Sequence, residues 1–101
     1  MLKIDKEKKD EIIYFKLMGE LDMYTGEALD NFLRNEDLAN IKKLVFSLDE
    51  LDFIDSTGIG QLIRYYREYV GIGVEVAVDN KNDDIEEVLE LIGLRQIIQG
   101  G

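Results

Sequence analysis

The stretch Phe53-Ile54-Asp55-Ser56-Thr57-Gly58-Ile59-Gly60 separates two segments with different hydrophobic patterns. Before it, Leu44-Val45-Phe46-Ser47-Leu48 is almost continuously apolar, which predicts a central strand covered on both faces. After it, apolar residues recur at helical spacing as far as about Val70, which predicts an amphipathic helix. The stretch therefore predicts a strand-to-helix junction, the connection from which sheets covered by helices are built.

Short hydroxyl residues occupy this junction. The first N–H groups of a helix have no internal partner, and the helix dipole is positive there. A hydroxyl at that point is expected to cap the helix, and a phosphorylated one would place its oxygens where donors already point. Ser56 is therefore a candidate switch residue, although capping alone is the simpler explanation of Asp55-Ser56-Thr57-Gly58 taken by itself.

The N-terminal third predicts a β-hairpin followed by a helix. Alternation over residues 2–5 and the β-branched and aromatic content of residues 12–18 predict two strands, joined by a charged turn at 6–10. Residues 19–22 are expected to end the second strand. Apolar residues at helical spacing over 28–33 predict the next helix, with Asp22 or Thr25 as its cap.

The second half of the chain continues the alternation of strands and helices. Residues 49–52 are expected to form an acidic connector, and Gly71 and Gly73 the left-handed stop of the central helix. Strand 74–78, a helix over 85–92 ended by Gly93, a short strand at 97–98 and a loose Gly100-Gly101 tail follow. The predicted order is β-β-α-β-α-β-α-β. It implies one α/β domain over 1–101, with a mixed sheet, right-handed crossovers and helices mainly on one face.

Composition excludes several classes of function. The chain has 101 residues and contains neither Cys nor His, which excludes Ser-His-Asp triads, thiolate metal sites and His-based zinc sites. Twenty-two acidic residues against twelve basic ones give a net charge of −10, which argues against nucleic acid or an anionic membrane as partner and is compatible with a basic protein. With no signal peptide and no apolar run long enough to cross a bilayer, a cytoplasmic protein is expected.

Four carboxylates, Asp22, Asp49, Asp52 and Asp55, lie near predicted strand ends or helix starts. Loops that follow the strands of a β-α-β sheet gather on one edge, so Asp22 and Asp55 are expected to lie close together. An oxygen-only Mg²⁺ site and a paired-carboxylate hydrolase are two possible uses of such a pair. We rank both below capping and solvation, because nothing else in the sequence specifies a substrate.

Two motifs carry a resemblance to a known family. Gly19-Glu20-Leu21-Asp22, followed by the segment from Leu48 to Gly60 that contains Asp55-Ser56-Thr57-Gly58, resembles the anti-sigma factor antagonists. These belong to the STAS (sulphate transporter and anti-sigma antagonist) domain family. The order of elements and the length match the family over essentially the whole chain.

The resemblance implies a partner-switching mechanism. Bacterial members bind an anti-sigma factor that is also a serine/threonine kinase with a histidine-kinase-like ATPase fold, and this binding frees the sigma factor. The kinase would phosphorylate Ser56, with Thr57 as the second choice of acceptor, and a serine phosphatase would reverse the step. ATP and Mg²⁺ would be held by the kinase, and this chain would carry no cofactor.

The resemblance and the expected helix together define a partner-binding surface. We expect it to comprise the acidic and phosphoacceptor positions of the motifs and two arginines of the helix as polar anchors, namely Asp22, Asp55, Ser56, Thr57, Gly58, Arg64 and Arg67. The sequence is thus interpreted as a regulatory binding protein and not an enzyme. The alternatives are a STAS subunit of a stress-sensing scaffold or transporter complex, and a small carboxylate- or metal-dependent enzyme that uses Asp22 and Asp55.

Overall fold

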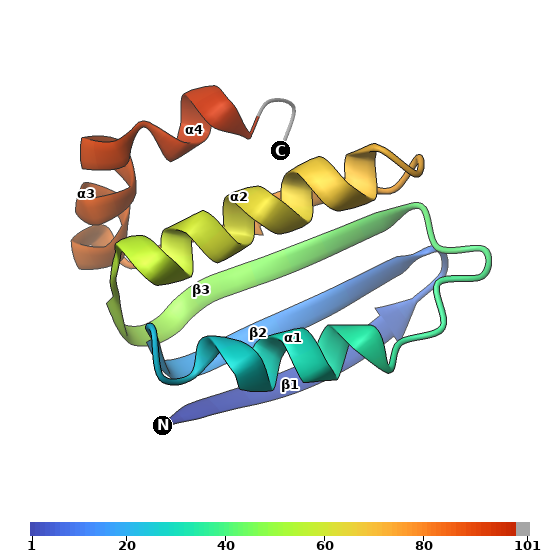
Figure 1. Cartoon of the computed structure of the whole chain (residues 1–101), viewed down its shortest axis with the longest axis horizontal. Coiled ribbons are helices and arrows are strands. Elements are labelled where there is room, and N and C mark those ends of the chain that lie inside the picture. Colours follow the sequence, from blue (N-terminus) through green and yellow to red (C-terminus); the bar gives the residue numbers. More distant parts are fainter. Residues whose placement is uncertain (99–101) are drawn as a thin grey trace.

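The structure, a computed structural model, describes residues 1–98. Over these residues the order of elements is β-β-α-β-α-β-α-α (Figure 1). The strands are β1 (Leu2–Lys9), β2 (Ile12–Leu21), β3 (Lys43–Ile54) and β4 (Glu75–Asp79), and the helices are α1 (Gly26–Arg34), α2 (Ser56–Val70), α3 (Asp83–Ile92) and α4 (Leu94–Ile97). None of the helices within 1–98 has the length and apolar content needed to cross a membrane.

The strands form one mixed sheet, as predicted, and lie in it in the order β1-β2-β3-β4. β1 and β2 pair antiparallel as a hairpin, whereas β2, β3 and β4 run parallel. The register brings Leu21, the last residue of β2, opposite Ile54, the last residue of β3. The segments that carry Asp22 and Asp55 therefore leave the sheet side by side.

The hydrophobic core lies between the sheet and the helices, which cover one face only (Figure 1). On β2 the predicted alternation is confirmed, because Ile13, Phe15 and Leu17 are fully buried. The ring of Phe15 stacks on Phe46 at 5.4 Å between centroids, and Phe46 stacks on Tyr65 of α2 at 5.7 Å. This column of aromatic rings fixes α2 over the centre of the sheet.

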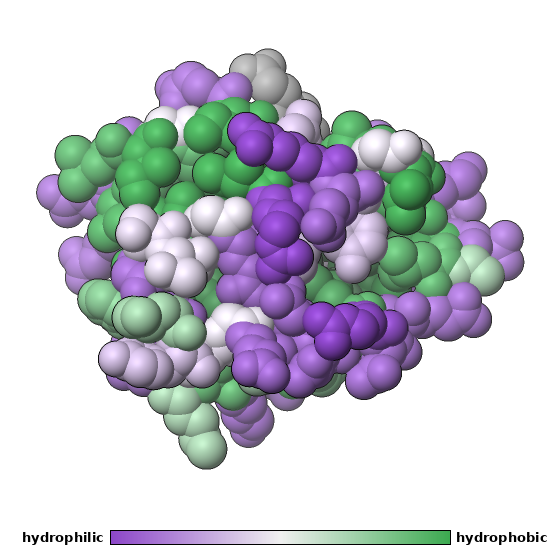
Figure 2. Space-filling view, in the orientation of Figure 1, coloured by the Kyte–Doolittle hydropathy of each residue, from purple (hydrophilic) through white to green (hydrophobic). Residues whose placement is uncertain are grey.

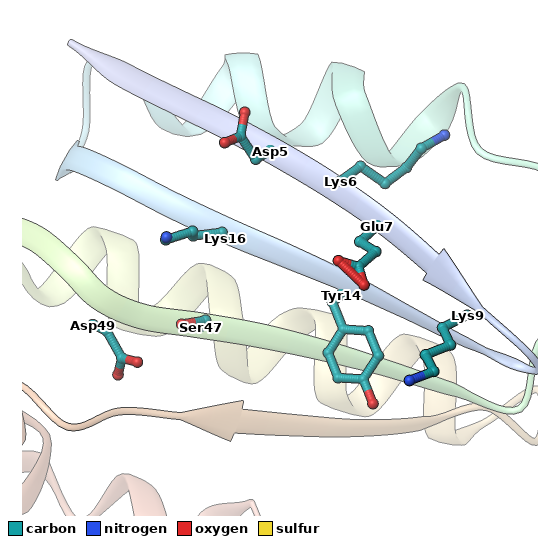
Figure 3. Close-up of a pocket in the computed structure, with 8 residues that line it drawn as sticks. All are labelled: Asp5, Lys6, Glu7, Lys9, Tyr14, Lys16, Ser47 and Asp49. Carbon is teal, nitrogen blue, oxygen red and sulfur yellow. The ribbon is translucent and has the colours of Figure 1, made fainter.

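The opposite face of the sheet is open, so the prediction that β3 is covered on both faces is wrong. Tyr14, Lys16, Ser47 and Asp49 project from this open face (Figure 3). Val45 lies on the same side and is only 5% exposed, although it is not part of the core cluster beneath the helices. The apolar run of β3 thus reflects a well-packed central strand with a single helical layer.

Three strand boundaries differ from the prediction. β1 continues to Lys9, so the turn predicted at 6–10 shrinks to residues 10–11. β2 passes through Gly19, whose φ of +93° accompanies register shifts against β3, so the glycine marks an irregularity within the strand and not its end. β3 runs through the predicted connector at 49–52, where only Leu51 faces the core. Pairing between strands outweighs the local preference of charged residues for turns.

The C-terminal prediction is also corrected. Residues 94–97 form the short helix α4 where the sequence predicted a strand at 97–98. Gly93, with φ of +76°, ends α3 as predicted and turns the chain so that Leu94 and Ile98 both reach the core. After α2 the left-handed stop is Gly73 alone (φ +87°), because Gly71 is right-handed (φ −62°). The predicted Gly100-Gly101 tail lies outside the described residues.

Two apolar areas remain on the outer surface of the helical layer. Figure 2 shows them in green, over α3 and α4 at the upper left and near the C-terminal end of α2 at the upper right, with hydrophilic surface between them. Leu91 (83% exposed) and Ile92 are the exposed apolar residues at the end of α3, and Val70 and Ile72 (68% exposed) those at and just after the end of α2. Both lie on helices or their ends and away from the β2–α1 connection.

Candidate functional site

Asp55 closes the junction between β3 and α2. Its Oδ1 accepts a hydrogen bond from the Gly58 N–H at 2.9 Å, and its carbonyl oxygen accepts one from the Ile59 N–H at 3.0 Å. The Asp55 N–H donates to the carbonyl of Leu21 at 3.3 Å, which ties the junction to β2. Asp55 is therefore the N-cap of α2, and the expectation that a hydroxyl caps this helix is wrong.

Ser56 is the first residue of α2, and its side chain is free for another role. Ser56 and Thr57 are both exposed. Within residues 1–98 the first-turn N–H groups of Gly58 and Ile59 have acceptors, whereas those of Ser56 and Thr57 have none. The Ser56 hydroxyl thus lies at the positive end of the α2 dipole, beside the two unbonded backbone N–H groups of Ser56 and Thr57.

Asp22 holds the turn between β2 and α1. Its Oδ1 accepts from the N–H groups of Tyr24 (2.9 Å) and Thr25 (3.1 Å), while its own N–H donates to the Thr25 Oγ1 at 3.0 Å. The Thr25 hydroxyl donates in turn to the carbonyl of Glu20 at 2.8 Å. Thr25 is the N-cap residue of α1 but makes no capping bond with its side chain, so the cap prediction is only half met.

The predicted proximity of Asp22 and Asp55 is confirmed by the paired ends of β2 and β3, Leu21 and Ile54. In the part of the chain from 1 to 98, no three or more Asp and Glu side chains converge in a way that could hold a metal ion. The pair is used in hydrogen bonds to backbone N–H groups, which explains both carboxylates without a ligand.

A groove of about 520 Å³ runs between the N-terminal halves of α1 and α2. Three residues predicted for partner binding line it, namely Asp22, Thr57 and Arg64, and so does Met23. The fold thus brings together Asp22, Thr57 of the predicted phosphoacceptor turn and Arg64. Arg67, the remaining predicted anchor, is exposed and makes no ion pair within the described chain.

A polar network that the sequence did not predict closes one end of the groove. The buried Gln61 donates from Nε2 to the Gly26 carbonyl at 2.7 Å and to the Tyr65 hydroxyl at 2.6 Å. The Tyr65 hydroxyl donates to Asp30 Oδ1, and Arg64 pairs with the same oxygen at 2.7 Å. These bonds join α1 to α2, so Arg64 is already engaged within the chain. The signal in the sequence was a polar Gln61 on the apolar side of a helix, four residues before Tyr65.

The chain is similar to known proteins over almost its whole length. The model of the STAS domain matches residues 3–100. The chain belongs to the STAS domain family. This STAS domain is 30% identical to the anti-sigma F factor antagonist of Paenibacillus polymyxa over 101 residues, which cover 96% of this chain and 84% of that protein.

Solved structures share the fold of this STAS domain. An anti-sigma factor antagonist from Mycobacterium paratuberculosis superposes with a TM-score of 0.82 at 24% identity, covering 95% of this chain and 81% of that one. The phosphorylated form of SpoIIAA, a Bacillus cell fate determinant, gives a TM-score of 0.69 at 21% identity, covering 91% and 85%. The single α/β fold with helices on one face of a mixed sheet is therefore that of the family.

The network at Asp30 predicts a pH dependence of stability. Burial alone would raise the pKa of the Asp30 carboxyl, but hydrogen bonds from Tyr65 and Arg64 outweigh it and leave the pKa lowered. A group whose pKa is lowered by folding stabilises the native state above its unfolded pKa of about 4 and loses that contribution as the pH falls further. We expect the free energy of unfolding, measured with urea, to fall less between pH 6 and pH 3 in Asp30→Asn than in wild type. Equal losses in the two proteins would contradict this role of Asp30.

Proposed function

We propose that this STAS domain is an anti-sigma factor antagonist that binds a kinase-type anti-sigma factor and is released by phosphorylation of Ser56. The name of the P. polymyxa relative supports the first part, since that protein is an anti-sigma F factor antagonist and matches almost the whole chain. The name of the Bacillus structure supports the second, since that protein has a phosphorylated form with the same fold.

One observation carries the choice of Ser56. Its hydroxyl is exposed at the first position of α2, while the capping role that would otherwise explain it belongs to Asp55. A serine at this position that makes no hydrogen bond from its side chain within residues 1–98 is accessible to a kinase and, once phosphorylated, to a phosphatase. Thr57 is exposed as well and remains the second choice.

The local electrostatics favour a switch over a permanent modification. A phosphate adds a charge of roughly −1.5 to −2 at neutral pH. In the free protein the dipole of α2 and the unbonded N–H groups of its first turn stabilise that charge. In a complex that covers Ser56, the phosphate would lose water beside Asp55 and at the same sheet edge as Asp22, so most of the penalty falls on the complex.

The proposed partners follow from this role. The anti-sigma factor would be a serine kinase with a histidine-kinase-like ATPase fold and would supply the ATP and Mg²⁺, and a serine phosphatase would restore the binding form. This chain would then act without a cofactor and without catalysing a reaction. Because sigma factors act in the cytoplasm, the proposal places the protein there.

Phosphorylation in vitro tests the acceptor directly. ATPases retained by the wild-type protein in a lysate of its source organism are identified by mass spectrometry, and the purified candidate is incubated with the protein, Mg²⁺ and labelled ATP. We expect wild type and Thr57→Val to incorporate phosphate and Ser56→Ala to incorporate none. The chain has only one other serine, Ser47, on the open face of the sheet. Because Ser47, Ser56 and Thr57 lie on one tryptic peptide, the two variants, and not the peptide alone, identify the acceptor.

Each other result of this experiment has a defined meaning. Label in Ser56→Ala but not in Thr57→Val would move the switch to Thr57. Stable binding of an ATPase with no phosphorylation would favour the stress-scaffold or transporter-subunit alternative. Failure of the folded wild-type protein to bind any ATPase would remove the anti-sigma assignment.

A further inference from the structure

Two large apolar side chains stand exposed beside the candidate site. Met23 is 65% exposed and Tyr24 is 84% exposed, both on the turn between β2 and α1. Tyr24 makes no side-chain hydrogen bond within residues 1–98. Neither residue belongs to the core cluster or packs against it. Their exposure is therefore not explained by the folding of this chain.

The turn that displays them is held rigidly. The N–H of Tyr24 is bonded to Asp22 Oδ1 at 2.9 Å, and the next N–H, of Thr25, to the same oxygen at 3.1 Å. The Thr25 hydroxyl bonds back to the Glu20 carbonyl at 2.8 Å. Apolar side chains on an ordered turn are pre-organised for binding, because little backbone entropy is lost when a partner covers them.

These side chains lie next to the phosphoacceptor turn. Met23 and Thr57 line the same groove, and the carbonyl of Leu21, two residues before Met23, accepts the N–H of Asp55. Figure 1 shows the β2–α1 connection and the start of α2 at the same end of the sheet. A protein that covers Ser56 at this end would also reach Met23 and Tyr24.

The charge around the turn limits what kind of surface can cover it. Glu20 and Glu27 are exposed on either side of the two apolar residues, and Asp22 lies between them. Glu20 is paired with the N-terminal amine at 2.6 Å and Asp30 with Arg64 at 2.7 Å, so within residues 1–98 Asp22 and Glu27 carry the uncompensated negative charge beside the turn. The turn thus presents an apolar centre within an acidic rim, which complements an apolar cleft with a basic rim.

We propose that Met23 and Tyr24 are the apolar anchor by which this protein docks on its kinase-type anti-sigma factor, inserting into an apolar cleft edged by Lys or Arg side chains. The inference rests on the proposed function and assigns to Asp22 the task of holding the anchor turn. Tyrosine is among the residues that most often dominate the binding energy of an interface. Ser56 then acts as a switch beside an anchor that does not itself change.

A binding anchor and a purely structural turn differ in the expected effects of substitution on kinase kinetics and on stability. Since the anchor works before and during phosphorylation, its loss raises the KM for phosphorylation of Ser56 by the kinase and leaves kcat unchanged. Since both side chains are mostly exposed and neither packs against the core, their loss leaves the thermal unfolding midpoint unchanged. We expect Tyr24→Ser to weaken kinase binding roughly 10- to 100-fold, and Met23→Ser to weaken it less.

The experiment compares these variants with two matched substitutions. Leu91→Ser replaces a side chain as exposed as Tyr24 (83% against 84%), and Ile72→Ser one as exposed as Met23 (68% against 65%). Binding of each purified variant to the purified kinase is measured by titration calorimetry, and phosphorylation of Ser56 by initial rates. We expect Leu91→Ser and Ile72→Ser to bind as wild type does.

The outcomes separate this inference from the proposed function. If wild type binds the kinase and all four variants bind equally well, the anchor is refuted while the antagonist role stands. If wild type and Tyr24→Ser bind alike but only wild type self-associates in sedimentation experiments, the turn is a contact between copies of this chain and the anchor is again refuted. If folded wild type binds no kinase, both proposals are refuted together.

Discussion

Gly58→Ala is expected to be the most destabilising glycine-to-alanine substitution near the candidate site. A Cβ at Gly58 would lie 2.5 Å from the carbonyl oxygen of Leu21 and 2.9 Å from its Cγ. The first of these is a backbone atom in the last residue of β2, so it cannot move aside without breaking the pairing with β3. Overpacking of this kind costs about 3 kcal/mol when the neighbour cannot yield.

Gly60→Ala provides the matched control on the same helix. A Cβ at Gly60 meets no atom within 4 Å, and the residue lies inside α2. Replacing an exposed helical glycine by alanine stabilises by about 0.5–1 kcal/mol. We therefore expect the two substitutions, two residues apart, to shift the thermal midpoint in opposite directions. For a domain of this size the expected drop for Gly58→Ala is roughly 12–24 °C.

Thermal unfolding followed by circular dichroism checks both variants in one experiment. A midpoint for Gly58→Ala within about 4 °C of wild type, a change of only about 1 kcal/mol, would mean that α2 can move away from β2 at little cost. The close approach of Gly58 to Leu21 would then not be what fixes the start of α2. In the structure that approach sets the position of Ser56, so the effect of Gly58→Ala also measures how firmly the proposed phosphoacceptor is held.

The local patterns of the sequence were sufficient for most of the fold. Alternation in β2 predicts which residues face the core, and helical spacing after Gly58 predicts α2 to within a residue. These signals succeed because each depends on which face of a single element is buried. The mixed sheet follows from the order of the elements, since a hairpin followed by crossovers leaves few arrangements.

The errors arise where pairing between distant segments decides. Residues 6–9 and 49–52 are rich in charge and read as turns, yet both lie in strands whose partner is β2. Their charged side chains face solvent, and a sheet that is open on one side tolerates them there. The apolar pair Ile97-Ile98 is too short for its sequence to distinguish a strand from a helical turn. The turn of the chain at Gly93 and the burial of Leu94 are what place these residues at the end of α4.

The sequence predicts which residues form the candidate site better than it predicts the role of each residue. Asp55 and Ser56 both prefer helix starts, and the sequence cannot say which one is the cap and which the first helical residue. The contacts of Asp30 with Gln61 and Tyr65 span more than thirty residues, so no local pattern reports them. The exposure of Met23 and Tyr24 is likewise a property of the folded turn, because apolar residues in a sequence are expected to be buried.

Ser56→Glu is expected to weaken binding to the kinase-type anti-sigma factor by roughly 5- to 150-fold, the range that corresponds to a coupling of about 1–3 kcal/mol. The carboxylate adds a negative charge at the first position of α2, next to Asp55. In the free protein the helix dipole favours an anion there by about 0.3–1 kcal/mol, so the variant is expected to be at least as stable as wild type. A loss of binding without a loss of stability identifies a penalty that exists only in the complex.

Ser47→Glu is the control for the added charge itself. Ser47 is the second serine of the chain and lies on the open face of the sheet with Lys16 and Asp49, on the side away from the helices (Figure 3). We expect Ser47→Glu to bind the kinase as wild type does in the same calorimetric titration, although the net charge has changed equally. If both glutamate variants lose affinity alike, the effect is one of overall charge, and raising the salt concentration should abolish it. If only Ser56→Glu loses affinity and Ser56→Ala retains it, the penalty belongs to a negative charge at the start of α2, as a phosphorylation switch requires.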